Sequence, residues 1–390
     1  MRSQPYLSNL SDPSCFRAID PACLLELVRP YADFFANHGV VLPDDPAELD
    51  VERIAPLMLQ PYPDSPYGLV DALVHINEIS TPAGMEALID EARRRGIDLP
   101  LDGPLAPADV AARVWLADPE LLRRKHAEHI VLRRRSFECF LARQGASLVR
   151  PARLDDAMRL FEEDLHAWFV DRGRGPGARV HVIEEKDEVR LVVRHGGPYR
   201  REGCLQAGEP GTVHFRPMDF HLLVLDLEAW ELRVNCKSKG EVKLYRESIG
   251  RRLFGQADFF DERSTKYTLE PLRRLGRRSL VCTDVPGLRA VRLIELGMYL
   301  GGPFGRKRIE QASDVLLAFE TDGDRIPDRA LLTKGNLEFE FEDSRKPRSV
   351  GIGSFNRARY TRDGDVALVE TFLRRRGFIT GDGHAAVACA

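Results

Sequence analysis

The sequence contains no run of about 18 consecutive apolar residues, the length that a membrane-spanning helix requires. Its first residues, MRSQPYLSNLSDPS, also lack the apolar core of a signal peptide. The seven cysteines are scattered without a CxxC pair, which favours reduced thiols over a zinc ribbon or a disulfide framework. We therefore expect a cytoplasmic protein without a membrane span. The abundance of Arg, Ala and Gly is typical of a bacterial protein from a GC-rich genome.

Signatures of nucleotide binding and of nucleophilic catalysis are missing as well. The stretch GGPFGRK at 301–307 lacks the Lys-Ser/Thr ending of a P-loop and is interpreted as a turn, and no GxGxxG opens a helix. No GxSxG elbow occurs. His126 and His129 have no third ligand at a matching spacing and are interpreted as surface residues. These absences favour a protein that is not an enzyme by itself, with no cofactor and no metal ion.

The charge is distributed unevenly along the chain. The net charge is −3, but residues 1–120 hold 8 Lys and Arg against 20 Asp and Glu, and the remainder holds 49 against 40. An acidic front and a basic back indicate different partners for the two parts. The alternative is that the two parts attract each other, or that the charges cover solvated faces.

The periodicity predicts a mixed fold, α+β or mixed α/β, in several parts. Helices are expected at Tyr67–Ile79, at Pro82–Arg95 after the cap Thr81, and at Glu120–Leu141. We predict the following division: a flexible tail at 1–15, a helical acidic domain at 16–145, a central mixed α/β domain at 151–328, a small module of a β-hairpin and a helix at 329–380, and a disordered tail at 381–390.

The clearest local pattern lies in the central domain. Two strands, His221–Asp226 and Glu231–Cys236, are predicted to form a hairpin that leads into a basic helix at Val242–Phe254. Further elements precede this hairpin: a helix at 155–170 and strands at 178–184 and 189–195.

The order of helix, strands and helix across 155–254 resembles a restriction-endonuclease-like core. The resemblance implies a metal-binding acid at Asp226 and a charge-stabilising lysine at Lys237, with Glu162 or Glu163 as a further ligand. Asn235 stands where such nucleases have their second acid, which argues against catalysis. Without catalysis, Asp226 is a turn residue and Lys237 is solvated.

Cations recur in the basic part of the chain. They are Lys237, Lys239, Lys243, Arg246, Arg251, Arg252, Arg273, Arg274, Arg306 and Lys307. Clusters of this kind neutralise phosphates, although interleaved acids such as Glu241 and Glu247 also indicate ion pairing on the helix surface.

These observations lead to one main hypothesis and two alternatives. The main hypothesis is a non-catalytic binding or adaptor protein whose basic central domain meets DNA or RNA and whose acidic domain meets a protein partner. An accessory subunit of a genome-maintenance or phage-defence system would be such a protein. The alternatives are a metal-dependent nuclease centred on Asp226 and Lys237, and a structural, oligomeric protein that does not touch nucleic acid.

Overall fold

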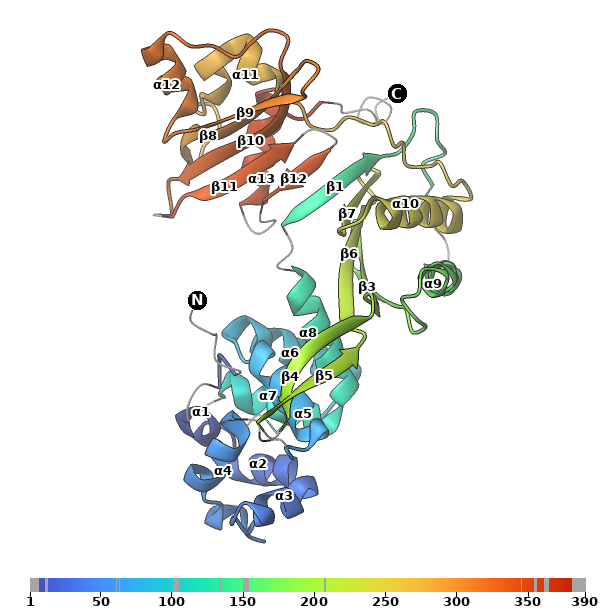
Figure 1. Ribbon diagram of the computed structural model, residues 1–390, viewed down its shortest axis with the longest axis vertical. Coiled ribbons are helices and arrows are strands. Elements are labelled where there is room, and N and C mark those ends of the chain that lie inside the picture. The colour runs from blue at the N-terminus through green and yellow to red at the C-terminus, as the bar shows by residue number, and fades with distance from the viewer. Residues whose placement is uncertain are drawn as a thin grey trace. The chain divides into compact units, whose positions relative to one another are not determined.

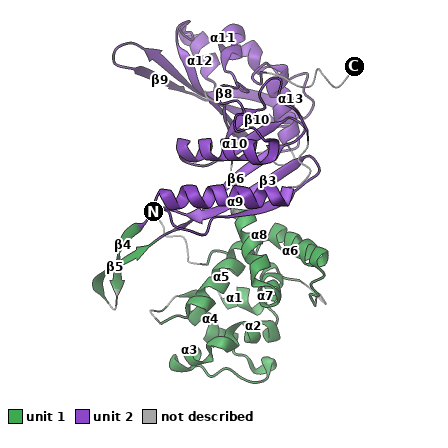
Figure 2. Ribbon diagram, turned by 90° about the vertical axis from the view of Figure 1, so that its right-hand side faces the viewer, with its two compact units in different colours: residues 1–132, 200–215 green, residues 133–199, 216–390 purple. Residues whose placement is uncertain are grey.

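The computed structural model describes residues 7–10, 13–60, 62, 64–100, 105–132, 135–149, 154–206, 208–344, 346–353, 356–360 and 365–380. The chain divides into two compact units, one of residues 1–132 with 200–215 and one of residues 133–199 with 216–390 (Figure 2). The predicted mixed α+β class is confirmed, since the second unit is built on a ten-stranded antiparallel sheet. Among the described residues, none of the helices combines the length and apolarity needed to cross a membrane.

The first unit consists of helices and one β-hairpin. Its elements are α1 (Pro13–Arg17), α2 (Pro21–Val28), η1 (Arg29–Tyr31), α3 (Ala32–Asn37), η2 (Pro46–Glu48), α4 (Val51–Leu59), α5 (Tyr67–Ile79), α6 (Pro82–Arg95), α7 (Pro107–Ala117), α8 (Pro119–Leu132), β4 (Arg200–Gln206) and β5 (Glu209–Phe215). Several helices begin at a proline after a capping side chain. Thr81 accepts a hydrogen bond from the N–H of Gly84, and Asp118 accepts one from the N–H of Leu121.

The expected flexible tail at 1–15 is wrong for the residues that the structure describes. Leu7 and Leu10 are buried in the core of the helical unit. The N–H of Asn9 donates to the side-chain Oδ1 of Asn77 at 2.7 Å. The burial of these two leucines and the hydrogen bond to Asn77 hold the segment against the helical unit. The prediction of a flexible tail relied on the prolines and small polar residues of the segment and did not take these contacts into account. The predicted tail at 381–390 lies outside the described residues.

The second unit carries one antiparallel sheet in the order β2-β3-β6-β7-β1-β12-β11-β10-β8-β9 (Figure 1). Its strands are β1 (Ser136–Leu141), β2 (Arg179–Glu184), β3 (Glu188–Gly196), β6 (Met218–Asp226), β7 (Glu231–Asn235), β8 (Leu288–Gly301), β9 (Arg306–Gln311), β10 (Leu331–Phe341), β11 (Arg348–Gly353) and β12 (Arg357–Arg359). Its helices are α9 (Leu154–Asp171), α10 (Lys239–Phe254), α11 (Glu270–Leu275), η3 (Gly276–Leu280), α12 (Val315–Asp322) and α13 (Val366–Arg375).

Two helices, α9 and α10, cover one face of strands β3, β6 and β7 (Figure 1). Alternate strand residues point to this face, so Leu191 and Val193 of β3 pack with Leu223 and Leu225 of β6 under the helices. By the same alternation, His195 of β3 and His221 of β6 point to this face one step further along. Both histidines therefore lie between the sheet and the two helices that cover it.

The long helix expected to run to Leu141 is wrong at its C-terminal end. Helix α8 ends at Leu132, and residues 136–141 form strand β1, which pairs with β7 on one side and β12 on the other. The three-residue spacing of Phe137 and Phe140 indicates one face of a helix, but in β1 they point to opposite faces of the sheet and both are buried. Strand β1 belongs to the second unit, and the helical domain therefore does not extend to 145.

The separate module expected at 329–380 is also not found. Strand β10 pairs with β8 from Leu331 to Phe341, so the predicted boundary at 328 falls within one half of the sheet. Strand β12 in turn pairs with β1, so the sheet continues on both sides of the expected module. Long-range pairing of this kind leaves no signal in a local pattern.

Candidate functional site

The structure separates the two residues on which the nuclease hypothesis was centred. In the β6–β7 hairpin, Asp226 pairs with Glu231 at the turn, whereas Leu222 pairs with Asn235 at the far end. Lys237 follows Asn235 and leaves the hairpin at that far end. A nuclease centre formed by Asp226 and Lys237 is therefore not assembled, because the strands are antiparallel and the two residues are at opposite ends.

Asp226 instead closes the hairpin turn. Its Oδ1 accepts hydrogen bonds from the N–H groups of Glu228 at 3.1 Å and Ala229 at 2.8 Å. Its Oδ2 lies 3.0 Å from a guanidinium nitrogen of Arg233, which is buried. The alternative interpretation of Asp226 as a turn residue is correct, with an added role as partner of a buried cation.

The acids expected to complete a metal site are engaged elsewhere. Glu162 accepts a hydrogen bond from the backbone N–H of Val180 at 2.6 Å, and so anchors the start of β2 to α9. Glu163 is exposed and pairs with Arg159, one turn earlier on α9, at 2.6 Å. Neither residue lines the pocket beside Lys237.

This pocket, of about 220 Å³, lies at the open end of the hairpin, where β7 gives way to α10. It is lined by Ser136, Asp219, Phe220, His221, Asn235, Cys236 and Lys237. Asp219 lies at the start of β6 and pairs with His195 of β3, so it occupies the position beside Lys237 that Asp226 was expected to hold. The structure thus brings together an acid, a histidine and a lysine.

Two other residues of the pocket have structural roles. The side-chain amide of Asn235 donates to the carbonyl of Ser136 at 2.6 Å, which holds the end of β7 against β1. Burial raises the pKa of the Cys236 thiol to about 12, so this thiol stays protonated and is a poor nucleophile.

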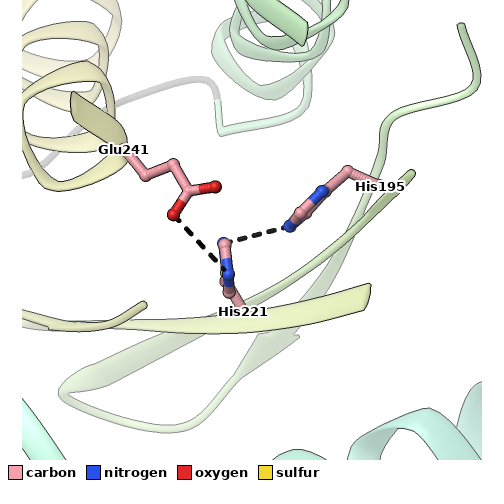
Figure 3. Close-up of side chains that lie close together, drawn as sticks. All are labelled: His195, His221 and Glu241. Carbon is pink, nitrogen blue, oxygen red and sulfur yellow. Dashed lines mark hydrogen bonds and ion pairs between the residues drawn. The ribbon is translucent and has the colours of Figure 1, made fainter. Parts of the chain in front are cut away.

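His221 also belongs to a buried polar cluster with His195 and Glu241 (Figure 3). Tyr245, which is buried as well, completes this cluster. The Nε2 of His195 is 3.2 Å from the Nδ1 of His221, and the Tyr245 hydroxyl is 2.7 Å from that same Nδ1. The Nε2 of His221 faces Oε2 of Glu241 at 4.0 Å. Strands β3 and β6 supply the histidines, and the first turns of α10 supply the other two side chains.

Burial keeps both imidazoles neutral near pH 7. It lowers the pKa of His221 from 6.5 to about 4, with a further lowering from the neighbouring His195. Burial also lowers the pKa of His195, although its hydrogen bond to the carbonyl of Gly196 opposes this shift. Two neutral imidazoles side by side retain lone pairs with which to bind an acid proton or a cation.

Glu241 is held in place by the geometry of the helix start. Ser238 caps α10, and the Ser238 hydroxyl and Glu241 carboxylate each bond the other's backbone N–H. The carboxylate also forms an ion pair with Arg174, which follows α9. The ring of His195 stacks on Phe169 of α9, with centroids 4.3 Å apart. Each member of the cluster is therefore oriented by a second contact.

The predicted cations do not form one continuous surface. Lys243, Arg246, Arg252 and Arg273 pair with Glu247, Glu262, Asp164 and Glu270 respectively. The other six are exposed and have no ion pair among the described residues: Lys237, Lys239, Arg251, Arg274, Arg306 and Lys307. Arg306 and Lys307 lie on β9, at the sheet edge six strands from β7. Only Lys237 and Lys239 lie at the pocket and the adjoining first turn of α10.

The prediction that His126 lies at the surface is wrong. His126 is buried in the first unit, where its Nε2 is 2.7 Å from Oε2 of Glu78.

Comparison with protein families gives no match for this chain, and none is found among curated proteins. The function of the chain must therefore be inferred from the geometry of its site.

Sequence reasoning missed Asp219, His195, His221 and Glu241 as a group. A signal was present, because His195 and His221 continue the apolar alternation of their strands where a solvated end would be expected. The spacing from Ser238 to Glu241 also matches a capping box. What the sequence does not show is the register of β3 on β6, which places the two histidines together.

Proposed function

We propose that the second unit binds the phosphate backbone of a nucleic acid at the Lys237 pocket without cleaving it. The observation that carries this proposal is an exposed lysine at the mouth of a polar pocket, with no ion pair among the described residues. Lys239 is exposed two positions on, and Lys243 follows at the next turn of α10.

The chemistry of this end of the hairpin suits a phosphate. Cations supply most of the affinity for a nucleic-acid backbone, because each neutralised phosphate releases counterions. Helix α10 begins at Lys239, so the positive end of its dipole lies at the same place as the lysines. Ser136 adds a hydroxyl to the pocket lining.

The same pocket is poorly equipped for metal-assisted hydrolysis through paired acids. Asp219 is its one carboxylate, and Asn235 holds the position from which a second acid would act. The protonated thiol of Cys236 offers no nucleophile. These features favour binding over cleavage.

Binding of labelled DNA and RNA oligonucleotides, followed by fluorescence anisotropy at low salt, tests the proposal. We expect Lys237→Glu to weaken binding by about tenfold or more, since it replaces an attraction to phosphate with a repulsion. Lys346→Glu is the matched control, because Lys346 is exposed on the turn between β10 and β11. Equal losses in both variants, or no binding by the wild-type chain, would refute the proposal.

A second candidate function is phosphodiester hydrolysis at the same pocket. The observation in its favour is the convergence of Asp219, His221 and Lys237, an acid, a base and a cation, on one cavity. Incubation of nucleic acid with Mg²⁺, Mn²⁺ or Zn²⁺ tests it. Cleavage by the wild-type chain that is abolished in both Asp219→Asn and Lys237→Ala would establish hydrolysis and refute the non-catalytic proposal. A substrate that stays intact would support the non-catalytic proposal.

For the first unit we propose a protein partner with a basic surface. The link between α3 and α4 exposes the acids Asp44, Asp45 and Glu48 next to the apolar Val41, whose side chain is 83% exposed. An apolar anchor beside acidic groups is a usual composition for a protein contact. Pull-down with a Val41→Asp variant against the wild-type chain tests this part, and equal recovery of the same partner would refute it.

A further inference from the structure

We infer that His195, His221 and Glu241 form a binding site for one transition-metal ion of the zinc class. Each of the three side chains offers one ligand atom, and these atoms all lie within 4.8 Å of one another. Two ligands of a tetrahedral zinc ion are about 3.4 Å apart, so small side-chain rotations close the set around an ion. This inference rests on the cluster alone and does not depend on nucleic-acid binding.

The hydrogen bonds of His195 leave one of its ring nitrogens ready for an ion. Its Nδ1 lies 2.9 Å from the carbonyl oxygen of Gly196, which only accepts, so Nδ1 carries the proton. In the neutral ring Nε2 then carries a lone pair, and it points into the cluster. A metal-binding histidine held through its other ring nitrogen by a backbone carbonyl is the usual arrangement at protein metal sites.

His221 is arranged in the same way. Its Nδ1 carries the proton, because the neighbouring Nε2 of His195 holds a lone pair. The Tyr245 hydroxyl oxygen, 2.7 Å from Nδ1, accepts a hydrogen bond from it, which leaves the lone pair of Nε2 facing the Glu241 carboxylate. The Nδ1 proton also lies close to Nε2 of His195, since the two nitrogens are 3.2 Å apart. When an ion takes the lone pair of His195, Tyr245 remains as the acceptor for His221.

The charges around the cluster balance a divalent ion in part. Glu241 supplies one negative charge. Its Oε1 meets Arg174, whereas its Oε2 accepts one hydrogen bond from the N–H of Ser238 and keeps a second lone pair for an ion. Arg174 opposes a cation, but Asp219, paired with His195 across β3 and β6, contributes another carboxylate nearby. Arg174 therefore acts as a hydrogen-bonding support for the carboxylate ligand, as such partners do at metal centres.

The types of the three ligands indicate which class of metal ion the site prefers. Two imidazoles and one carboxylate suit Zn²⁺ and its neighbours, whereas Mg²⁺ and Ca²⁺ prefer oxygen ligands throughout. Three protein ligands leave a fourth position open, as in zinc sites that bind water or a further ligand. His221 also lines the 220 Å³ pocket, so the open position has a route to solvent.

Titration of the intact, chelator-treated 390-residue chain with Co²⁺, followed by visible absorption, tests the inference. We expect one equivalent to bind with the intense d–d bands of a four- or five-coordinate site, and Zn²⁺ to displace it. Glu241→Gln, His195→Gln and His221→Gln should each abolish these bands. His166→Gln, which alters an exposed histidine of α9, should leave them unchanged.

Two further readouts keep the test decisive if a ligand variant fails to fold. Tyr245→Phe retains all three ligands but removes the support of His221, and should weaken Co²⁺ binding about tenfold. A thiolate-to-cobalt charge-transfer band should be absent, because Cys236 is not a ligand. No Co²⁺ binding by the wild-type chain, unchanged affinity in Tyr245→Phe, or a thiolate band would overturn the inference.

Discussion

At the scale of single residues, the second unit places charged and titratable groups in its interior and pairs each of them. Glu231 is almost fully buried and forms an ion pair with Lys266, and Arg233 lies between Glu188 and Asp226. A buried charge is tolerated only with such partners, so loss of one partner is more damaging than loss of both.

Lys266→Ala tests this rule. Burial alone would lower the pKa of Lys266, but the Glu231 carboxylate raises it, so the lysine is charged in the folded protein. Its removal leaves the buried Glu231 carboxylate with Arg233, whose Nε is 3.8 Å away, as its remaining ion-pair partner among the described residues. We expect the free energy of unfolding to fall by about 3–5 kcal/mol. Urea denaturation gives the value. The double variant Glu231→Gln, Lys266→Met should be less destabilised than Lys266→Ala, and a larger loss would contradict the rule.

His221 predicts a pH dependence of stability. Its folded pKa of about 4 lies below the ordinary 6.5, so the unfolded chain binds a proton first as the pH falls. Stability is therefore present above about pH 6.5 and is lost toward pH 4. Between about pH 7 and pH 5 we expect the wild-type chain to lose about 2 kcal/mol more than His221→Gln. The charged and titratable side chains around His221 are those of His195, Glu241, Arg174, Asp219 and Tyr245.

Urea denaturation of the chelator-treated protein at the two pH values measures that difference. His166→Gln serves as the control and should keep the full pH dependence of the wild-type chain, because His166 is exposed. An equal loss in the wild-type chain and in His221→Gln would show that His221 is not held neutral by burial.

At the scale of elements, the sequence predicts those whose stability is local. The β6–β7 hairpin, α10, β10 and β11 appear where periodicity and turn residues place them. Strand β1 was missed because its partners, β7 and β12, lie far along the chain. The β4–β5 hairpin is local, and it was missed because its glycines and its mostly exposed residues give no clear apolar alternation. Asp219 was missed because the first strand of the hairpin was predicted to begin at His221, whereas β6 begins at Met218 and includes Asp219.

Asp226 tests the corrected view of the hairpin. The sequence predicts only a slight effect for Asp226→Ala, whereas its contacts with the turn and with buried Arg233 predict a loss of about 1–3 kcal/mol. Glu228→Ala, on an exposed position of the same turn, should change stability by less than about 0.5 kcal/mol. Thermal denaturation of both variants decides, and equal small effects would favour the simpler turn residue.

At the scale of the whole molecule, the chain crosses between its units more often than composition suggests. The segment 144–149 was expected to separate two domains, but it connects β1 to α9 within the second unit, and its Ala146 and Leu148 pack against the core there. The small and polar residues of this segment predicted a domain boundary. The unit to which the flanking residues belong is instead determined by the pairing of β1 with β7 and β12.

Limited proteolysis tests this assignment. We expect an early cut between Gln144 and Arg153, as the small polar residues and the proline of this stretch indicate. The two fragments should nevertheless elute together in native size exclusion, because β1 pairs with both β7 and β12. Release of a free N-terminal fragment under native conditions would restore the division near residue 145.

The most direct test of the central claim is the salt dependence of nucleic-acid affinity. If the lysines at the pocket and the start of α10 bind phosphates, the slope of log K against log salt should be shallower in the triple variant Lys237→Ala, Lys239→Ala, Lys243→Ala. We predict a reduction in slope of about 0.7–0.9 for each phosphate that the variant no longer neutralises. A wild-type chain that does not bind at low salt, or a triple variant with the wild-type slope, would contradict the claim.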